Sequence, residues 1–156
     1  MASCHPLYPP PMPNSTLVKF GFPDTLIRDY EHWCVLLRPA QVTLASLVLG
    51  SRSEAQSFSR IPPQAFAELA AVTHDIEEGL KAFRPYDKIN YLMLMMVDPH
   101  VHFHVLPRYR EPQEFRELMI ADKGWPAAPD LASAITLAPA ERSLLRDAII
   151  AAWPRD

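Results

Sequence analysis

The stretch "DPHVHFHVLPRY", residues 98–109, places His100, His102 and His104 at alternate positions. Successive side chains of a β-strand point to opposite faces of its sheet, so the three imidazoles would share one face. The residues between them share the other face, and they are Val101, Phe103 and Val105. The pattern predicts a strand from His100 to Pro107 that buries its apolar face and presents its histidines on the open face.

Other apolar runs predict the strands around it. The runs Trp33–Leu37 and Leu44–Ser51 are typical of an antiparallel hairpin built around "RPAQVT". The run Lys88–Val97 is nearly apolar on both faces, which favours a central strand.

The segment between Pro62 and Pro85 predicts a long amphipathic helix. Its apolar residues recur at spacings of three and four, and they are Phe66, Leu69, Val72, Ile76, Leu80 and Phe83. Proline is tolerated in a first helical turn, and a last helix is expected to begin near Pro139. Strands on both sides of a long helix predict an α+β fold, with an antiparallel sheet and the helix packed on one face.

The composition fits one domain. The chain has 156 residues, of which 49% are hydrophobic, and this length suits a single hydrophobic core. Residues 1–15 contain five prolines between Pro6 and Pro13 and predict an extended tail. Residues 16–156 are then expected to form one domain that includes the C-terminal helix.

Charge and cysteine content limit the partners and the compartment. A net charge of -3 gives no broad electrostatic footprint for a nucleic acid polymer, although a local cluster of donors could still bind one anionic ligand. No apolar run approaches the length of a membrane span, and the first residues lack the features of a signal peptide. The cysteines Cys4 and Cys34 form no disulfide framework, so we expect a reducing, cytoplasmic setting.

Three histidines on one strand face admit a structural, a metal-binding and a catalytic interpretation. A single histidine on a strand is usually a surface residue or a hydrogen-bonded core residue. Neutral imidazole is a poor replacement for a solvated Lys or Glu, so a purely structural role does not explain three histidines on one face. Zinc binds imidazole nitrogen at about 2.0–2.1 Å, whereas the outer two histidines lie about 13 Å apart at the backbone. A pair would need further ligands, and the remaining histidines are His5, His32 and His74. We therefore expect no metal.

The catalytic interpretation is favoured. Neutral imidazole forms covalent intermediates, and neighbouring histidines can fix its tautomer and stabilise developing negative charge. A phosphorus centre suits this arrangement because phosphoryl oxygens accept several hydrogen bonds at once. Arg108 follows the strand and adds a positive charge with a forked set of donors.

The motif from His100 to Arg108 resembles the signature of the histidine-triad (HIT) superfamily, in which histidines alternate with apolar residues and Pro-Arg commonly follows. The order of elements from roughly Thr16 to Tyr109 is also similar. Residues 88–110 look like bacterial members related to diadenosine polyphosphate hydrolases. The resemblance implies a HIT-like antiparallel sheet of about five strands with helices, usually paired as a homodimer whose two sheets join.

The resemblance also implies an activity: a nucleotide hydrolase or nucleotidyl transferase that cleaves a phosphoanhydride or phosphoramidate at the α-phosphate. His102 would attack phosphorus and form a nucleotidyl-histidine intermediate. His104 would contact the phosphate and assist the leaving group, and His100 would orient the other two. Contacts with the nucleotide substrate are expected from Asn90, Arg38 and Arg108. The mechanism requires no metal or cofactor.

Three positions depart from the family pattern. The segment Met95–Asp98 stands where many members have a Gly-Gln turn that helps to hold phosphate. Ala45-Ser46 stands where many have Gly-His, and Arg38 lies near the place of a ribose-binding Asp or Asn. A second hypothesis is therefore a non-catalytic nucleotide-binding or scaffold protein on the same fold.

Overall fold

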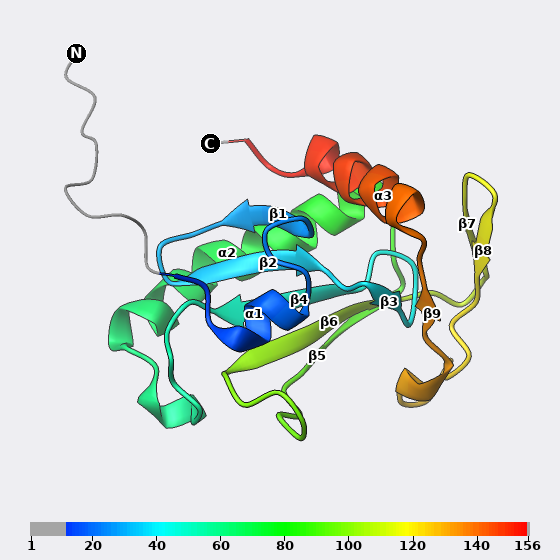
Figure 1. Cartoon of the computed structure of the whole chain (residues 1–156). Coiled ribbons are helices and arrows are strands. Elements are labelled where there is room, and N and C mark those ends of the chain that lie inside the picture. The colour runs from blue at the N-terminus through cyan, green and yellow to red at the C-terminus, as the bar shows by residue number, and fades with distance from the viewer. Residues whose placement is uncertain (1–11, 156) are drawn as a thin grey trace, which may run out of the picture.

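The computed structural model describes residues 12–155 (Figure 1). Most of the predicted tail lies outside these residues, so the division into a tail and a domain stays a prediction. The first helix, α1 (Ser15–Lys19), begins one residue before the predicted domain boundary. Its N-cap is Asn14, whose side chain accepts a hydrogen bond from the backbone N–H of Leu17.

A five-stranded sheet forms the centre of the fold. Its strands lie in the order β1 (Leu26–Asp29), β2 (Trp33–Leu37), β4 (Leu47–Ser51), β6 (His102–Arg108) and β5 (Lys88–Leu92). Every neighbouring pair is antiparallel. The predicted α+β class, with an antiparallel sheet of about five strands, is confirmed.

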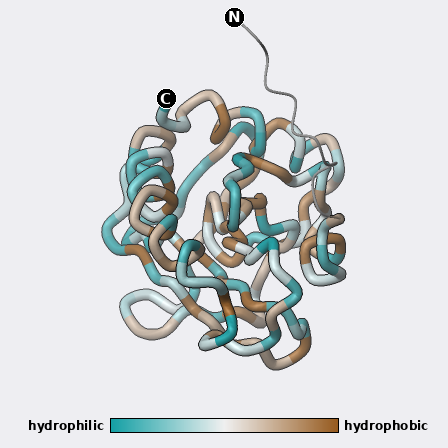
Figure 2. Tube along the Cα trace, turned by 90° about the vertical axis from the view of Figure 1, so that its left-hand side faces the viewer, coloured by the Kyte–Doolittle hydropathy of each residue, from teal (hydrophilic) through white to brown (hydrophobic). Residues whose placement is uncertain are grey.

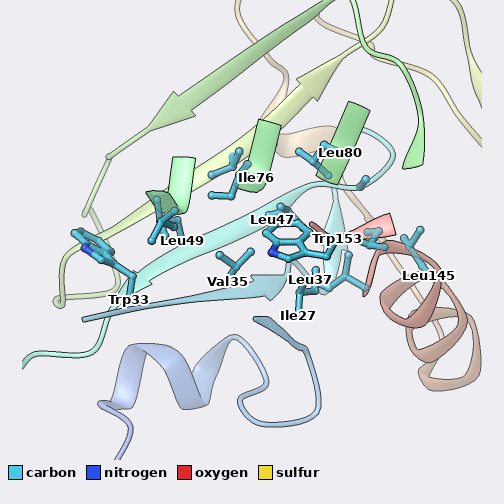
Figure 3. Packing of buried hydrophobic residues seen from close by; sticks show 14 of the residues in the cluster. Ile27, Trp33, Val35, Leu37, Leu47, Leu49, Ile76, Leu80, Leu145 and Trp153 are labelled. Atoms are coloured by element: carbon cyan, nitrogen blue, oxygen red, sulfur yellow. The ribbon is translucent and has the colours of Figure 1, made fainter. Parts of the chain in front are cut away.

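Two helices cover one face of this sheet. The long helix α2 (Pro63–Phe83) buries part of the predicted stripe, including Val72, Ile76 and Leu80. The C-terminal helix α3 (Pro139–Ala152) adds Leu145 and Ile149 to the same core. Figure 3 shows α2 above side chains of β2 and β4 and α3 at their right, and Val101 and Val105 join the cluster from the β6 segment. In Figure 2 the helical turns change between hydrophilic and hydrophobic residues, as expected for helices with one buried face.

Helix α1 covers the opposite face. Leu17 packs with Cys34, Leu36 and Val48, which point away from α2. A Cβ atom built on Gly50 would lie 2.3 Å from Leu17 Cδ2, so the absence of a side chain at position 50 lets α1 approach β4 closely. All five residues of β2 are buried because the strand lies between these two layers.

Three strand predictions need correction. The predicted strand His100–Pro107 spans His102–Arg108 instead, so His100 lies before β6. The predicted strand Leu44–Ser51 begins only at Leu47, because the chain first turns through Ala45, whose φ is 68°. The predicted strand Lys88–Val97 ends at Leu92 and lies at the edge of the sheet rather than at its centre. Its apolar sequence continues into a loop, residues 93–98, that leaves the sheet.

Smaller elements complete the described chain. Strand β3 (Ala40–Gln41) pairs with β9 (Ile135–Thr136), and β7 (Gln113–Phe115) forms a hairpin with β8 (Leu118–Ile120). Two short 3-10 helices are η1 (Phe58–Arg60) and η2 (Leu131–Ser133). None of the helices within residues 12–155 is both long and apolar enough to cross a membrane.

Candidate active site

His102 and His104 lie on the face of β6 that points away from α2, as predicted, whereas His100 lies just before the strand. His102 and His104 line a pocket of about 350 Å³ together with residues of α1 and of the 93–98 loop. This face is not open, however. The exposed fractions of His100, His102 and His104 are 6%, 2% and 8%, because α1 and neighbouring loops cover the strand.

His100 is held on both ring nitrogens. Thr16 Oγ1 accepts a hydrogen bond from the His100 backbone N–H at 3.2 Å, so its own hydroxyl hydrogen can be donated to His100 Nδ1 at 2.9 Å. The other nitrogen, Nε2, lies 3.0 Å from a carboxylate oxygen of Glu54. A carboxylate accepts only, so Nε2 carries the hydrogen. His100 is not among the residues that line the pocket, and its hydrogen bonds hold the chain just before β6 against α1 and Glu54.

The tautomer of His102 follows from a single contact. Its Nδ1 lies 2.7 Å from the backbone carbonyl oxygen of His100. A carbonyl oxygen only accepts hydrogen bonds, so Nδ1 carries the hydrogen and the lone pair of the neutral ring is on Nε2. The residue that points into the pocket thus has the nitrogen that a nucleophile requires.

His104 has the complementary arrangement. Arg38 Nε donates a hydrogen bond to His104 Nδ1 at 3.3 Å, so the hydrogen of the neutral ring is on Nε2. Burial, the Arg38 charge and the His102 ring together lower the pKa of His104 to about 4. At neutral pH the His104 ring is uncharged and can donate from Nε2, and its centroid is 5.1 Å from that of the His102 ring.

Arg38 is fixed by the turn that joins β2 to β4. Its Nη1 donates to the carbonyl of Ala40, and its backbone N–H donates to the carbonyl of Ser46 at 2.9 Å. Gln41 closes the turn through both ends of its amide, donating to the Ser46 carbonyl and accepting from the Ser46 N–H. Ala45 takes the left-handed conformation within this turn. This turn places the Arg38 guanidinium, whose pKa is lowered by burial, among the groups that line the pocket.

Two further pocket residues, Phe20 and Lys19, were not predicted from the sequence. The Phe20 ring, just after α1, lies 5.5 Å from the His102 ring and 5.8 Å from the His104 ring. Lys19, the last residue of α1, forms an ion pair with Asp98 at 2.5 Å. The signal that could have located them is Asn14, which is a favoured N-cap before a short apolar segment.

Asn90 and Arg108 do not join His102 and His104. They line a separate pocket near residues 125–128. Arg108 binds the buried carboxylate of Asp122 through Nε at 2.5 Å and Nη2 at 3.0 Å, and its Nη1 donates to Asn90 Oδ1 at 2.8 Å. Another bond from Nη2 reaches the carbonyl of Ala127. Most of the Arg108 donors are therefore bound within the chain.

The metal-binding interpretation finds no support at the three histidines within the described part of the chain. The set of three ligand atoms within 4.8 Å of one another belongs to Glu31, His32 and Glu68, which lie before β2 and on α2. This set contains none of the triad histidines.

Comparisons with known proteins support the fold. No protein-family model matches the sequence, and no match is found among curated proteins. Among solved structures, a histidine-triad protein from Sinorhizobium meliloti is 20% identical with a TM-score of 0.69, and the match covers 90% of this chain and 95% of that chain. A hypothetical histidine-triad nucleotide-binding protein from Sulfolobus tokodaii is 17% identical with a TM-score of 0.67, covering 88% of each chain. A zinc-bound histidine-triad family protein from Mycobacterium smegmatis is 18% identical with a TM-score of 0.57, covering 86% of this chain and 89% of that chain.

In this fold two of the alternating histidines, His102 and His104, lie on β6 and line a pocket. The chain has the fold of the histidine-triad proteins.

Proposed function

We propose that the protein is a nucleotide hydrolase or nucleotidyl transferase that acts at an α-phosphate. The observation that carries the proposal is the hydrogen bond from His102 Nδ1 to the His100 carbonyl, because it leaves the lone pair on Nε2. In the first step Nε2 forms a bond to phosphorus while the bond to the leaving group breaks, and the leaving group takes the electron pair. In the second step an oxygen of water or of another acceptor forms a bond to phosphorus, the N–P bond breaks with its electron pair returning to Nε2, and the proton of the acceptor is released to solvent.

The residues around His102 have distinct roles in this proposal. His104 donates a hydrogen bond from Nε2 to a phosphoryl oxygen, and Arg38 supplies positive charge where negative charge develops. His100 acts through its carbonyl, which fixes the tautomer of the nucleophile. Asn90 and Arg108 are left out, since their polar groups are bound to each other and to Asp122.

The test is the formation of a covalent nucleotidyl adduct. The protein is mixed with an adenosine 5′-phosphodiester that has a good leaving group, quenched with base and measured by intact-protein mass spectrometry. Wild type should gain the mass of one AMP group, while His102→Ala should gain none and lose turnover. His74→Ala is the matched control, because His74 is an exposed residue of α2, and it should behave as wild type.

Two results would contradict the proposal. Turnover by His102→Ala at the wild-type rate would remove His102 as the nucleophile. Tight AMP binding without any adduct or turnover in wild type would instead support the second hypothesis of a non-catalytic binding protein.

We also propose that the protein is a homodimer formed through β5. This strand is one of the two edges of the five-stranded sheet in the described chain, although the run 88–97 to which it belongs predicted a central strand. Pairing with β5 of a second copy would place it at the centre of a joined sheet. Sedimentation equilibrium should give twice the chain mass, and Tyr91→Pro, which removes a backbone donor from the edge, should shift the protein toward the monomer; a monomeric wild type would contradict the proposal.

A further inference from the structure

One wall of the histidine pocket consists of consecutive apolar residues. Leu94, Met95, Met96 and Val97 all line the pocket beside His102 and His104. The side chains of Leu94, Met96 and Val97 are 45%, 86% and 80% exposed. Exposed large apolar side chains that adjoin a site commonly mark a binding surface.

The segment 94–97 is held in place by Met95, which packs against the hydrophobic core, and by Asp98, which follows it. Met95 adopts a left-handed backbone conformation with φ of 50°, and its side chain packs against the main hydrophobic core. A non-glycine residue in that conformation persists only where surrounding contacts hold it. Asp98, which follows the wall, is bound to Lys19 of α1. The outward direction of Met96 and Val97 is thus set by the fold.

The charges around the pocket match a substrate with little negative charge. The pocket residues include two cations, Lys19 and Arg38, and one anion, Asp98. Their formal sum of +1 balances the single charge of a phosphodiester. A dinucleoside polyphosphate has several negative charges in sequence, and the apolar wall offers those charges no side-chain donor.

We propose that residues 94–97, here called the apolar wall, bind an apolar leaving group attached to the α-phosphate. The substrate class is then a nucleoside 5′-phosphodiester, or a similar monoanionic ester, with an uncharged apolar substituent. This inference rests on the proposed function. During the first step the P–O bond to that substituent breaks, and the substituent departs as an anion with the electron pair and is then protonated by water.

A leaving-group series tests the inference. Adenosine 5′-(4-alkylphenyl) phosphates with methyl, propyl and pentyl chains have nearly equal phenol acidities, so differences in rate report contacts of the alkyl chain. We expect kcat/KM of wild type to rise along the series by up to about four-fold for each buried CH₂ group. Diadenosine tetraphosphate should have a lower kcat/KM than the pentyl ester.

Variants of similar size locate the effect. Met96→Gln and Val97→Thr should flatten the dependence of kcat/KM on alkyl length. Met119→Gln is the matched control, because Met119 is exposed on β8 outside the pocket. It should keep the full dependence.

Several outcomes would overturn the inference. Turnover through a His102 adduct with no dependence on alkyl length would refute the apolar-wall assignment and leave the proposed function standing. A change in base preference in Met96→Gln, with the alkyl dependence intact, would assign the wall to the nucleobase instead. A shift in oligomeric state in Met96→Gln with unchanged alkyl dependence would assign it to subunit contact. Absence of any adduct and turnover in wild type would reject the proposed function and this inference with it.

Discussion

Arg38 Nε donates a hydrogen bond to His104 Nδ1, although the two residues are 66 positions apart in the sequence. The contact places a permanent positive charge beside an imidazole that burial already keeps neutral. It also fixes the ring hydrogen of neutral His104 on Nε2.

Removal of the Arg38 charge should raise the pKa of His104. In Arg38→Gln the second largest cause of the lowered pKa is lost, while burial remains, so the pKa should move from about 4 toward the usual 6.5 without reaching it. NMR titration of the imidazole resonances measures this directly. Arg60→Gln, on the exposed helix η1, is the control and should leave the pKa unchanged. An unaltered His104 titration in Arg38→Gln would show that the guanidinium does not act on the ring.

The lowered pKa of His104 should make folding stability depend on pH. Between about pH 4 and 6.5 the unfolded state binds more protons at this residue than the folded state does. The free energy of unfolding therefore increases by up to about 3 kcal/mol as the pH rises from about 4 to 6.5. It decreases by the same amount as the pH falls through this window. Urea denaturation at several pH values measures the slope. His104→Gln should have a smaller slope over this window, and an equal slope in both proteins would contradict the assignment.

The Thr16 hydroxyl should stabilise both the fold and the nucleophile. Thr16→Val keeps the shape but removes the contacts with the His100 backbone N–H and with Nδ1. We expect a loss of about 1–3 kcal/mol in the free energy of unfolding and a lower kcat, because the His100 carbonyl that orients His102 is less firmly held. Thr73→Val on α2, which removes a bond to the Leu69 carbonyl of the same helix, should change the stability less and leave kcat intact. Equal effects of the two substitutions would argue against a special role for Thr16.

A side chain at position 50 should displace α1. In Gly50→Ala the new Cβ would overlap Leu17 Cδ2, so the buried Leu17 side chain must move or carry α1 with it, at a cost of about 1–3 kcal/mol. The shift should also reduce activity, since Phe20 follows α1 and contacts His102 and His104. A double-mutant cycle with Leu17→Ala measures the coupling: the new methyl group fits the space that Leu17 leaves, so the two losses should be less than additive. Strict additivity would contradict the steric explanation.

The pair formed by Arg108 and Asp122 should support stability rather than chemistry. The Asp122 side chain is 1% exposed, so Asp122→Asn leaves a buried guanidinium without its charge partner. We expect a loss of about 3–5 kcal/mol in the free energy of unfolding, with kcat/KM of the folded fraction within about two-fold of wild type. Denaturation curves combined with rates measured per active site separate the two quantities. A specific loss of kcat/KM at unchanged stability would instead assign Arg108 to the substrate.

Local patterns in the sequence were enough to predict the main elements. Alternation of histidine and apolar residues assigned the two faces of β6, because the side-chain period of a strand depends only on its own backbone. The spacing of Val72, Ile76 and Leu80 predicted the buried stripe of α2 for the same kind of reason. The position of Lys88–Leu92 at the edge could not be predicted in this way, since pairing depends on the other strands.

The sequence by itself determined which histidines share a face and which helix lies behind them. Only the tertiary structure decided what surrounds the imidazoles: Thr16 reaches His100 across 84 positions, and Arg38 rather than Arg108 reaches His104. It also decided that α1 covers the strand and that the segment after Leu92 becomes a pocket wall. The physical reason is that periodicity is a property of a few consecutive residues, whereas hydrogen-bond partners and burial depend on how distant segments pack together.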